Sequence, residues 1–139
     1  MLRNKVVVFG YNALWILSLV NNCICVLVMR FVPLKKKQMD LSQEDWVAKQ
    51  EGLSGVVILD VRSEEEFENA HLPDAQLLNI QNPQGFMDGL ATMDVSKNYF
   101  VYCRSGARSA QACMLMKQQG FTSAYNLLGG ILAWQGTVV

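Results

Sequence analysis

One cysteine with two arginines close behind it is the part of this sequence best suited to chemistry. Cys103 is followed directly by Arg104, and Arg108 completes a Cys-x4-Arg spacing. Nearby positive charge favours a thiolate over a thiol and holds the pKa below the ~8.5 of a free cysteine. A thiolate stabilised in this way needs no histidine to remove its proton. We therefore predict that Cys103 is a catalytic nucleophile.

The elements around Cys103 should place it where such a nucleophile works. Residues 99–102 are aromatic or β-branched and predict a strand, and residues 107–119 are good helix formers closed by Gly120. Cys103 then lies at the carboxyl edge of a sheet, beside a helix N-terminus whose unpaired N–H groups favour an anion. The predicted substrate-binding residues are those of this turn: Arg104, Ser105, Gly106, Ala107 and Arg108.

The rest of the sequence alternates strand and helix patterns, which predicts an α/β fold whose central sheet is mostly parallel and flanked by helices. The hydrophobic run 56–59 is typical of a strand buried on both faces, and Ser63 begins a helix directly after it. Ser42 precedes a helix with an acid at its third position, as in a capping box. The remaining expected elements are a helix over 43–51, a strand over 75–80, a helix over 85–91, a strand over 124–127 and a helical turn over 131–134.

Other polar residues have more ordinary interpretations. Asp60 and Arg62 follow the buried strand and are predicted to pair with each other or with the loop, as support for the site. Cys113 lies among small helix residues and is expected in the core. His71 is expected to be a hydrogen-bonded structural imidazole, and the acidic run 64–66 to complement a helix dipole. With four cysteines, one histidine and no C-x-x-C pair, we predict neither a metal site, nor a cofactor, nor a disulfide framework.

Charge and length limit the function classes. The chain has 139 residues, enough for one ordinary globular domain. From Met39 onward it carries six basic and twelve acidic side chains, a formal net charge of −6. Such a domain would repel a phosphate backbone, so no nucleic-acid partner is expected.

Residues 1–38 form a separate segment with a basic linker at its end. Residues 6–29 carry no charge, and at ~1.5 Å per residue they could cross a ~30 Å hydrocarbon layer. The basic residues that follow predict a cytoplasmic location for the C-terminal side. Two interpretations stay open: a membrane anchor, or sequence upstream of a true start at Met39. The catalytic domain is predicted to occupy residues 39–139.

Four blocks of sequence, in this order, resemble the single-domain rhodaneses. They are Leu59-Asp60-Val61-Arg62, then Glu66-Phe67-Glu68-Asn69-Ala70-His71-Leu72-Pro73-Asp74-Ala75, then Cys103-Arg104-Ser105-Gly106-Ala107-Arg108-Ser109, then Leu128-Gly129-Gly130-Ile131-Leu132-Ala133-Trp134. Cys-x4-Arg alone arises often by chance, whereas four ordered blocks are a strong signal. Ala70 and Asp74 stand where glycine is usual in the family.

The resemblance implies a three-layer rhodanese-like fold and sulfurtransferase chemistry. Cys103 would take sulfane sulfur from a small-molecule donor such as thiosulfate, become a persulfide, and pass the sulfur to a thiol or cyanide acceptor. The six-residue loop from Cys103 to Arg108 favours sulfur over phosphate or arsenate, for which relatives carry a seven-residue loop. The alternative is a membrane-tethered persulfide carrier or docking module that serves a protein sulfur acceptor.

Overall fold

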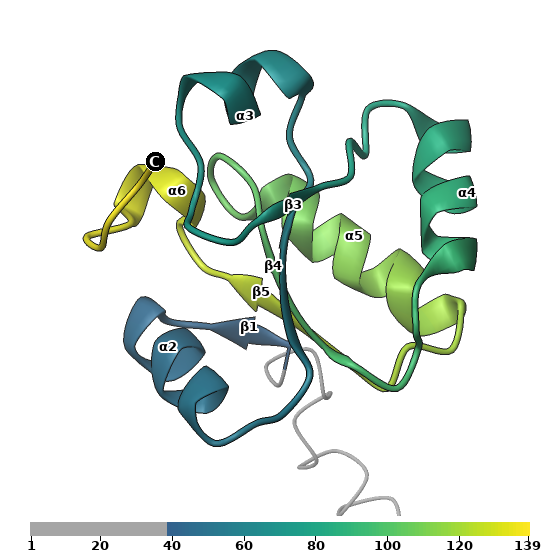
Figure 1. Cartoon of the computed structure of the whole chain (residues 1–139), viewed down its shortest axis with the longest axis horizontal. Helices are drawn as coiled ribbons and strands as arrows, with labels where there is room; N and C mark the ends of the chain where they lie inside the picture. The colour runs from purple at the N-terminus through teal and green to yellow at the C-terminus, as the bar shows by residue number, and fades with distance from the viewer. Residues whose placement is uncertain (1–38) are drawn as a thin grey trace, which may run out of the picture. The chain divides into compact units, whose positions relative to one another are not determined.

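A single parallel sheet organises the part of the chain that the computed structural model describes, residues 39–139. Its strands run in the order β1-β5-β4-β2-β3, and every neighbouring pair is parallel (Figure 1). The strands are β1 (Asp40–Leu41), β2 (Val56–Asp60), β3 (Gln76–Leu77), β4 (Asn98–Tyr102) and β5 (Ser123–Leu127). The helices are α2 (Gln43–Glu51), α3 (Glu64–Asn69), α4 (Pro83–Thr92), α5 (Ala107–Gln118) and α6 (Gly130–Ala133).

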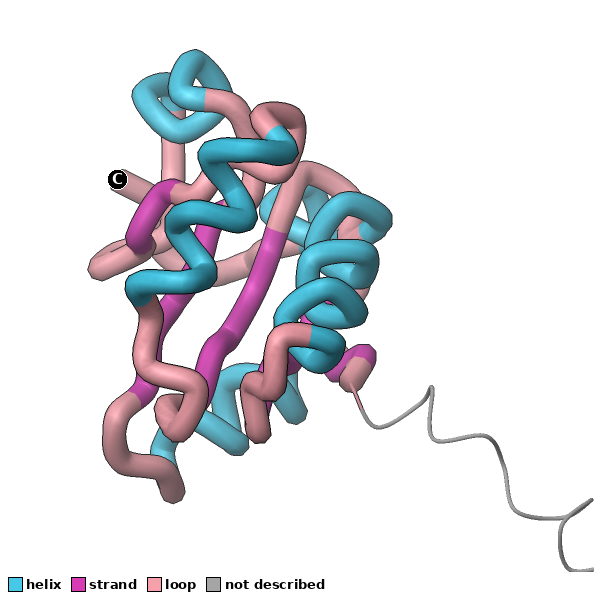
Figure 2. The backbone as a smooth tube through the Cα atoms, turned by 90° about the vertical axis from the view of Figure 1, so that its right-hand side faces the viewer, coloured by secondary structure: helices cyan, strands magenta, loops and turns pink. Residues whose placement is uncertain are grey.

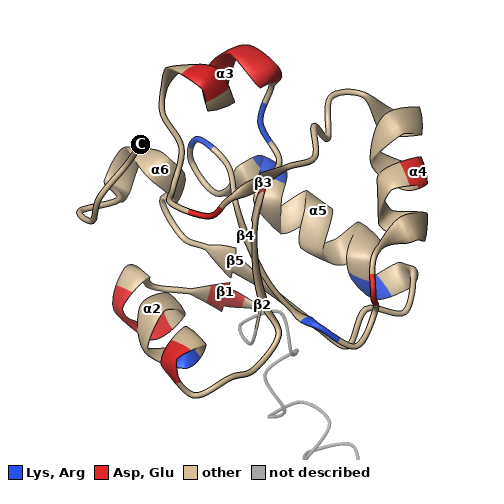
Figure 3. Ribbon diagram, viewed as in Figure 1, with Lys and Arg blue, Asp and Glu red and all other residues tan. Residues whose placement is uncertain are grey.

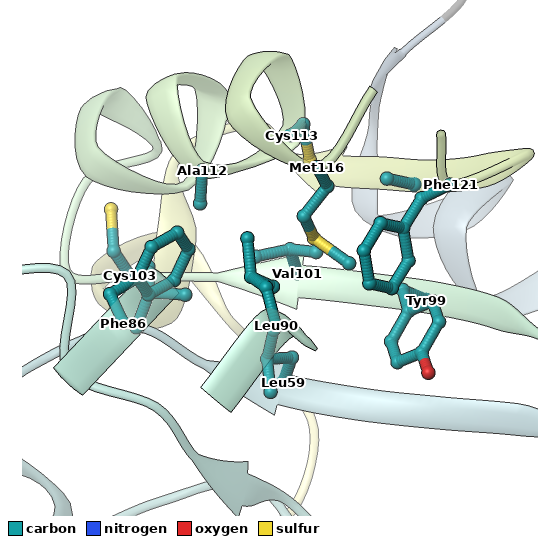
Figure 4. Packing of buried hydrophobic residues seen from close by; sticks show 12 residues of the cluster. Leu59, Phe86, Leu90, Tyr99, Val101, Cys103, Ala112, Cys113, Met116 and Phe121 are labelled. Carbon is teal, nitrogen blue, oxygen red and sulfur yellow. The ribbon is translucent and has the colours of Figure 1, made fainter. Parts of the chain in front are cut away.

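Helices cover both faces of the sheet, as the alternation of side chains along β4 requires. Tyr99 and Val101 point to one face and pack against α4 and α5, in a cluster that includes Leu90 and Met116 (Figure 4). The side view of Figure 2 looks onto this layer. Phe100 and Tyr102 point to the other face, where their cluster contains Trp46 of α2 and, partly buried, Ile131 of α6 and Trp134 directly after it. The expected three-layer α/β architecture is confirmed.

The helix starts follow from local sequence. Ser42 caps α2 by accepting a hydrogen bond from the Asp45 N–H at 3.2 Å, as expected. At α3 the capping box is complete: Ser63 accepts from the Glu66 N–H, and the Glu66 carboxylate accepts from the Ser63 N–H. Glu66 therefore does more than complement the helix dipole.

The two edge strands differ from the expectation. The strand expected over 75–80 is paired as a strand only over Gln76–Leu77, because the chain then turns, with Asn79 accepting from the Gln81 N–H. Beyond that point two single hydrogen bonds keep it beside β2, from the N–H groups of Leu78 and Ile80. Strand β1 was not expected from the sequence, since two residues carry no recognisable pattern.

The two positions where the family usually has glycine behave differently. Asp74 has a φ of 59°, in the left-handed region that favours glycine. Ala70 has a φ of −170°, which is extended backbone that any residue adopts. The backbone angle at residue 74 therefore favours glycine, whereas the angle at residue 70 does not.

The expected membrane anchor over residues 6–29, and the linker that follows it, lie outside the described residues. Within residues 39–139, no helix combines the length and the apolar character that crossing a membrane requires.

Candidate active site

Cys103 is the first residue after the central strand β4, and its side chain is buried where α5 begins. The residue is 0% exposed. Its Sγ accepts a hydrogen bond from the Gly106 N–H at 3.1 Å and one from the Ser109 hydroxyl at 3.3 Å. The donors therefore converge on the sulfur from the loop and from the first turn of the helix, an arrangement that suits a thiolate.

The two buried cysteines differ in their acidity. Burial raises the pKa of Cys103, but hydrogen bonds from the Ser109 hydroxyl and from the Ser109, Gly106 and Ser105 backbone outweigh it, so the pKa lies below its ordinary value. Burial without such donors raises the pKa of Cys113 to about 12. The expected core role of Cys113 is confirmed, and of the two only Cys103 is poised to ionise.

Two glycines determine the shape of the loop. Gly106 caps α5 with a φ of 97°, and a Cβ added there would lie 3.1 Å from the Leu127 carbonyl oxygen. At Gly130, with a φ of 56°, an added Cβ would collide with the carbonyl groups of Cys103 and Arg104. The same two carbonyls accept hydrogen bonds from the N–H groups of Ile131 and Leu132, the second and third residues of α6, at 2.9 and 3.1 Å. Helix α6 thus holds the loop against the end of the sheet.

The two arginines of the loop have different surroundings. Arg104 is exposed and forms no ion pair with any residue in 39–139. Arg108 forms two hydrogen bonds to the Glu66 carboxylate, at 2.7 and 2.8 Å. These bonds to Arg108 are the main reason that the pKa of Glu66 falls to about 2. In this structure Glu66 therefore compensates the charge of Arg108.

Asp60 and Arg62 form a buried pair, as expected. Arg62 Nε bonds both Asp60 carboxylate oxygens at 2.9 and 3.0 Å, and Nη2 bonds one of them at 2.6 Å. Nη2 also donates to the Ala70 carbonyl at 2.7 Å. The pair therefore braces the segment after α3, which borders the site. His71 places Nδ1 2.9 Å from the Phe67 carbonyl, which confirms the hydrogen-bonded structural imidazole.

The predicted substrate-binding residues 104–108 are together around Cys103, with Arg104, Ser105 and Ala107 exposed, Gly106 buried and Arg108 half-buried. The sequence prediction missed three residues with direct contacts here: Ser109, Glu66 and Gly130. The sequence did contain a local signal for Ser109. It is a polar residue in the first turn of α5, close in sequence to the loop that holds Cys103. Glu66 and Gly130 act across long stretches of sequence and gave no local signal.

A pocket of about 470 Å³ opens beside the loop. Figure 3 shows basic positions on the loops after β2 and before α5, next to the acidic helix α3. The pocket is lined by Arg62, Glu66, Asn69, Ala70, Arg104, Ile131, Leu132, Trp134, Gly136 and Val138.

The sequence of this chain is similar to those of known proteins. The sequence model of the rhodanese-like domain matches residues 43–137. A sulfurtransferase from Allochromatium vinosum is 38% identical over 80 residues, which cover 57% of this chain and 71% of that protein. The thiosulfate sulfurtransferase GlpE from Pseudomonas savastanoi pv. phaseolicola is 32% identical over 83 residues, 60% of this chain and 76% of that protein. Other curated relatives are longer, and the match spans 22% of them.

The fold is also found in solved structures. The crystal structure of a rhodanese-like domain protein from Staphylococcus aureus superposes with a TM-score of 0.59 at 27% identity, covering 68% of this chain and 89% of that one. The names of the curated relatives support an enzyme whose general reaction is sulfur transfer. The family's sequence model matches most of the chain, and the fold agrees with a solved rhodanese-like structure. The chain therefore belongs to the rhodanese-like domain family.

Proposed function

We propose that this protein is a sulfurtransferase in which Cys103 carries the sulfur as a persulfide between an anionic donor such as thiosulfate and a thiol or cyanide acceptor. The observation that carries the proposal is the pair of hydrogen bonds to Sγ, from the Gly106 N–H and the Ser109 hydroxyl. They lower the pKa of the one cysteine that stands at the carboxyl end of the central strand.

The first half-reaction uses the thiolate as the nucleophile. Sγ attacks the outer sulfur of thiosulfate, the sulfur–sulfur bond of the donor breaks, and sulfite leaves with the bonding electron pair. In the second half-reaction the acceptor attacks the outer sulfur of the persulfide, and Sγ leaves again as a thiolate. Neither step needs an added oxidant or reductant, and the backbone N–H groups that hold the thiolate also serve its charged persulfide.

The residues around Cys103 have supporting roles in this proposal. Arg104 and the backbone of Ser105, Gly106 and Ala107 would receive the anionic donor, and Arg108 would keep the start of α5 in place through Glu66. The Asp60–Arg62 pair would support the wall of the site.

The test is the mass of the intact chain after treatment with thiosulfate. We expect the mass of one added sulfur atom, with release of one equivalent of sulfite. Cys103→Ser should gain no sulfur, whereas the matched control Cys113→Ser should gain it as the natural chain does. Loading that survives in Cys103→Ser and disappears in Cys113→Ser would show that the nucleophile is wrongly assigned.

A further inference from the structure

The two arginines of the Cys103 loop do not offer the same charge to a donor. Arg104 is exposed and has no ion-pair partner within residues 39–139. The Arg108 guanidinium, by contrast, is paired with the Glu66 carboxylate. Guanidinium groups attract and orient anions, so an acidic partner reduces the positive charge that an anionic donor meets at the loop.

The Glu66 carboxylate binds Arg108 in the way that an oxyanion would. Its two oxygens accept hydrogen bonds from the two terminal nitrogens of the guanidinium, at 2.7 Å from Nη1 and 2.8 Å from Nη2. This is the bidentate geometry in which arginine binds carboxylates and phosphates. A donor oxyanion that approached the same edge of the guanidinium would therefore have to displace Glu66.

Arg108 lies close enough to the sulfur for its charge to affect the approach of a donor. The hydrogen bonds to Glu66 do most to raise the pKa of Arg108, and the nearby negative charges of Cys103 and Asp60 raise it further. The side chains of Arg108 and Glu66 are 25% and 29% exposed, so both can be reached from solvent. Cys103 is 0% exposed, so a donor meets these charged side chains before it meets the sulfur.

We infer that Glu66 is a specificity-determining residue of this site, because its carboxylate competes with anionic donors for the Arg108 guanidinium. The inference rests on the function proposed above and deepens its first half-reaction. In the natural chain an anion gains a contact with Arg108 only by breaking the pair with Glu66. The site therefore favours an anion over a neutral reagent less than its two loop arginines would allow. Without the Glu66 carboxylate, Arg108 is free to bind the oxygens of the donor.

Two alkylating reagents test this inference in the full chain without sulfur transfer. Iodoacetate is an anion, whereas iodoacetamide is neutral, and alkylation of Cys103 by each is followed by peptide mass. The ratio of the two rate constants measures the preference for an anion, because changes in thiolate population affect both reagents equally. At low ionic strength, Glu66→Gln should increase this ratio about tenfold, since the freed guanidinium gains a charge-assisted contact. Glutamine also serves in a capping box, so the start of α3 is kept.

A double-variant cycle isolates the role of Arg108. Arg108→Gln should lower the ratio below that of the natural chain, because the negative charge of Glu66 is left uncompensated. The variant that carries both Glu66→Gln and Arg108→Gln should return to within about twofold of the natural chain, since both charges of the pair are gone. Glu65→Gln is the matched control. It removes an exposed carboxylate that has no ion pair within residues 39–139 from the same helix, and should change the ratio less than about twofold.

Loading with thiosulfate tests the same competition in the proposed reaction. The rate constant for sulfur gain at limiting thiosulfate is followed by intact mass and divided by the rate constant for iodoacetamide. Glu66→Gln should give the highest value, the natural chain and the double variant should be equal, and Arg108→Gln should give the lowest. Thiosulfate carries two negative charges, so the increase in Glu66→Gln should be at least about tenfold.

The outcomes distinguish this inference from the proposed function. If the natural chain gains no sulfur from thiosulfate, the proposed function fails, and the alkylation ratios still decide whether Glu66 competes for Arg108. If Glu66→Gln leaves the ratios unchanged, or if Glu65→Gln raises them equally, the inference is wrong. It is also wrong if the double variant keeps the full increase of Glu66→Gln, since the gain would then come from the loss of a negative charge and not from Arg108.

Discussion

Glu66 and Arg108, which are 42 positions apart in the sequence, join helix α3 to the first turn of the helix behind Cys103. The Glu66 carboxylate bonds both terminal nitrogens of the Arg108 guanidinium and also completes the capping box with Ser63. One carboxylate thus stabilises its own helix start and the position of α5. Bidentate pairs of this kind are more specific in geometry than a lysine contact would be.

This relationship predicts an acid-sensitive contribution to stability. The bonds to Arg108 hold the pKa of Glu66 at about 2, below its ordinary 4.5. A carboxyl group with a lowered folded-state pKa stabilises the protein above its unfolded pKa, and this stability is lost as pH falls from 4.5 towards 2. Because both side chains are partly exposed, we expect a contribution of about 1 kcal/mol.

The measurement is the free energy of unfolding against pH for the natural chain, Glu66→Gln and Arg108→Gln. Above pH 4.5, each single variant should lose the same amount of unfolding free energy, and the double variant should lose little more than either single variant. Additive losses would show that the two side chains stabilise the fold independently.

Ser109→Ala should make Cys103 less acidic. The Ser109 hydroxyl donates to Sγ at 3.3 Å, so its removal disfavours the thiolate. Loss of one hydrogen bond to a charged acceptor is worth about 1.5 kcal/mol, or about tenfold in thiolate population at neutral pH. Alkylation of Cys103 by iodoacetamide, measured against pH, should move its midpoint upward. Ser105→Ala is the matched control, because the Ser105 contribution comes from its backbone N–H. An equal shift in both variants would contradict the role of the Ser109 hydroxyl.

Gly130→Ala should damage both the loop and the fold. The new Cβ would meet the backbone carbonyls of Cys103 and Arg104, which cannot rotate away, and the left-handed φ adds strain. We expect a loss of at least about 2 kcal/mol in denaturant unfolding. Gly120→Ala shares a positive φ but has open space around it, so it should cost only the strain of about 1 kcal/mol. Equal losses of unfolding free energy in the two variants would show that the contact of the new Cβ at residue 130 with the loop carbonyls adds no destabilisation.

Asp74→Gly and Ala70→Gly should have opposite effects on stability. At Asp74 the φ of 59° is strained for any residue with a Cβ, so glycine should stabilise the fold by up to about 1 kcal/mol. At Ala70 the backbone is extended, so glycine only increases the freedom of the unfolded chain and should cost about 0.5–1 kcal/mol. Thermal unfolding of the two variants measures the difference. A destabilised Asp74→Gly would mean that the Asp74 side chain makes a contribution larger than its backbone strain.

What the sequence predicted well was local. Strand β4, the turn after it and α5 each have their own pattern of residue types, and a strand followed by a helix places Cys103 at the sheet edge in any parallel α/β fold. Ser42 and Ser63 likewise mark helix starts within four residues of themselves.

What the sequence did not predict depends on contacts between distant residues. Strand β1 was not expected and exists because β5 offers it a partner, whereas the strand expected over 75–80 is paired with β2 only over Gln76–Leu77. The pairing of Glu66 with Arg108 and the fit of Gly130 under the loop arise only when the chain is folded. The same is true of the pocket, whose lining residues come from three separate stretches of sequence, 62–70, 104 and 131–138.

The central position of β4 has a consequence for how the molecule opens. β4 pairs with β2 along its whole length and with β5 from Asn98 to Val101, whereas β1 and β3 at the two edges are short. Amide hydrogens in β4 should therefore exchange with solvent deuterium only through global unfolding, while those at the edges exchange through small local openings. We expect Cys103, which directly follows β4, to be held by the last part of the described chain to open, so that local openings at the sheet edges leave Sγ and its hydrogen-bond donors in place.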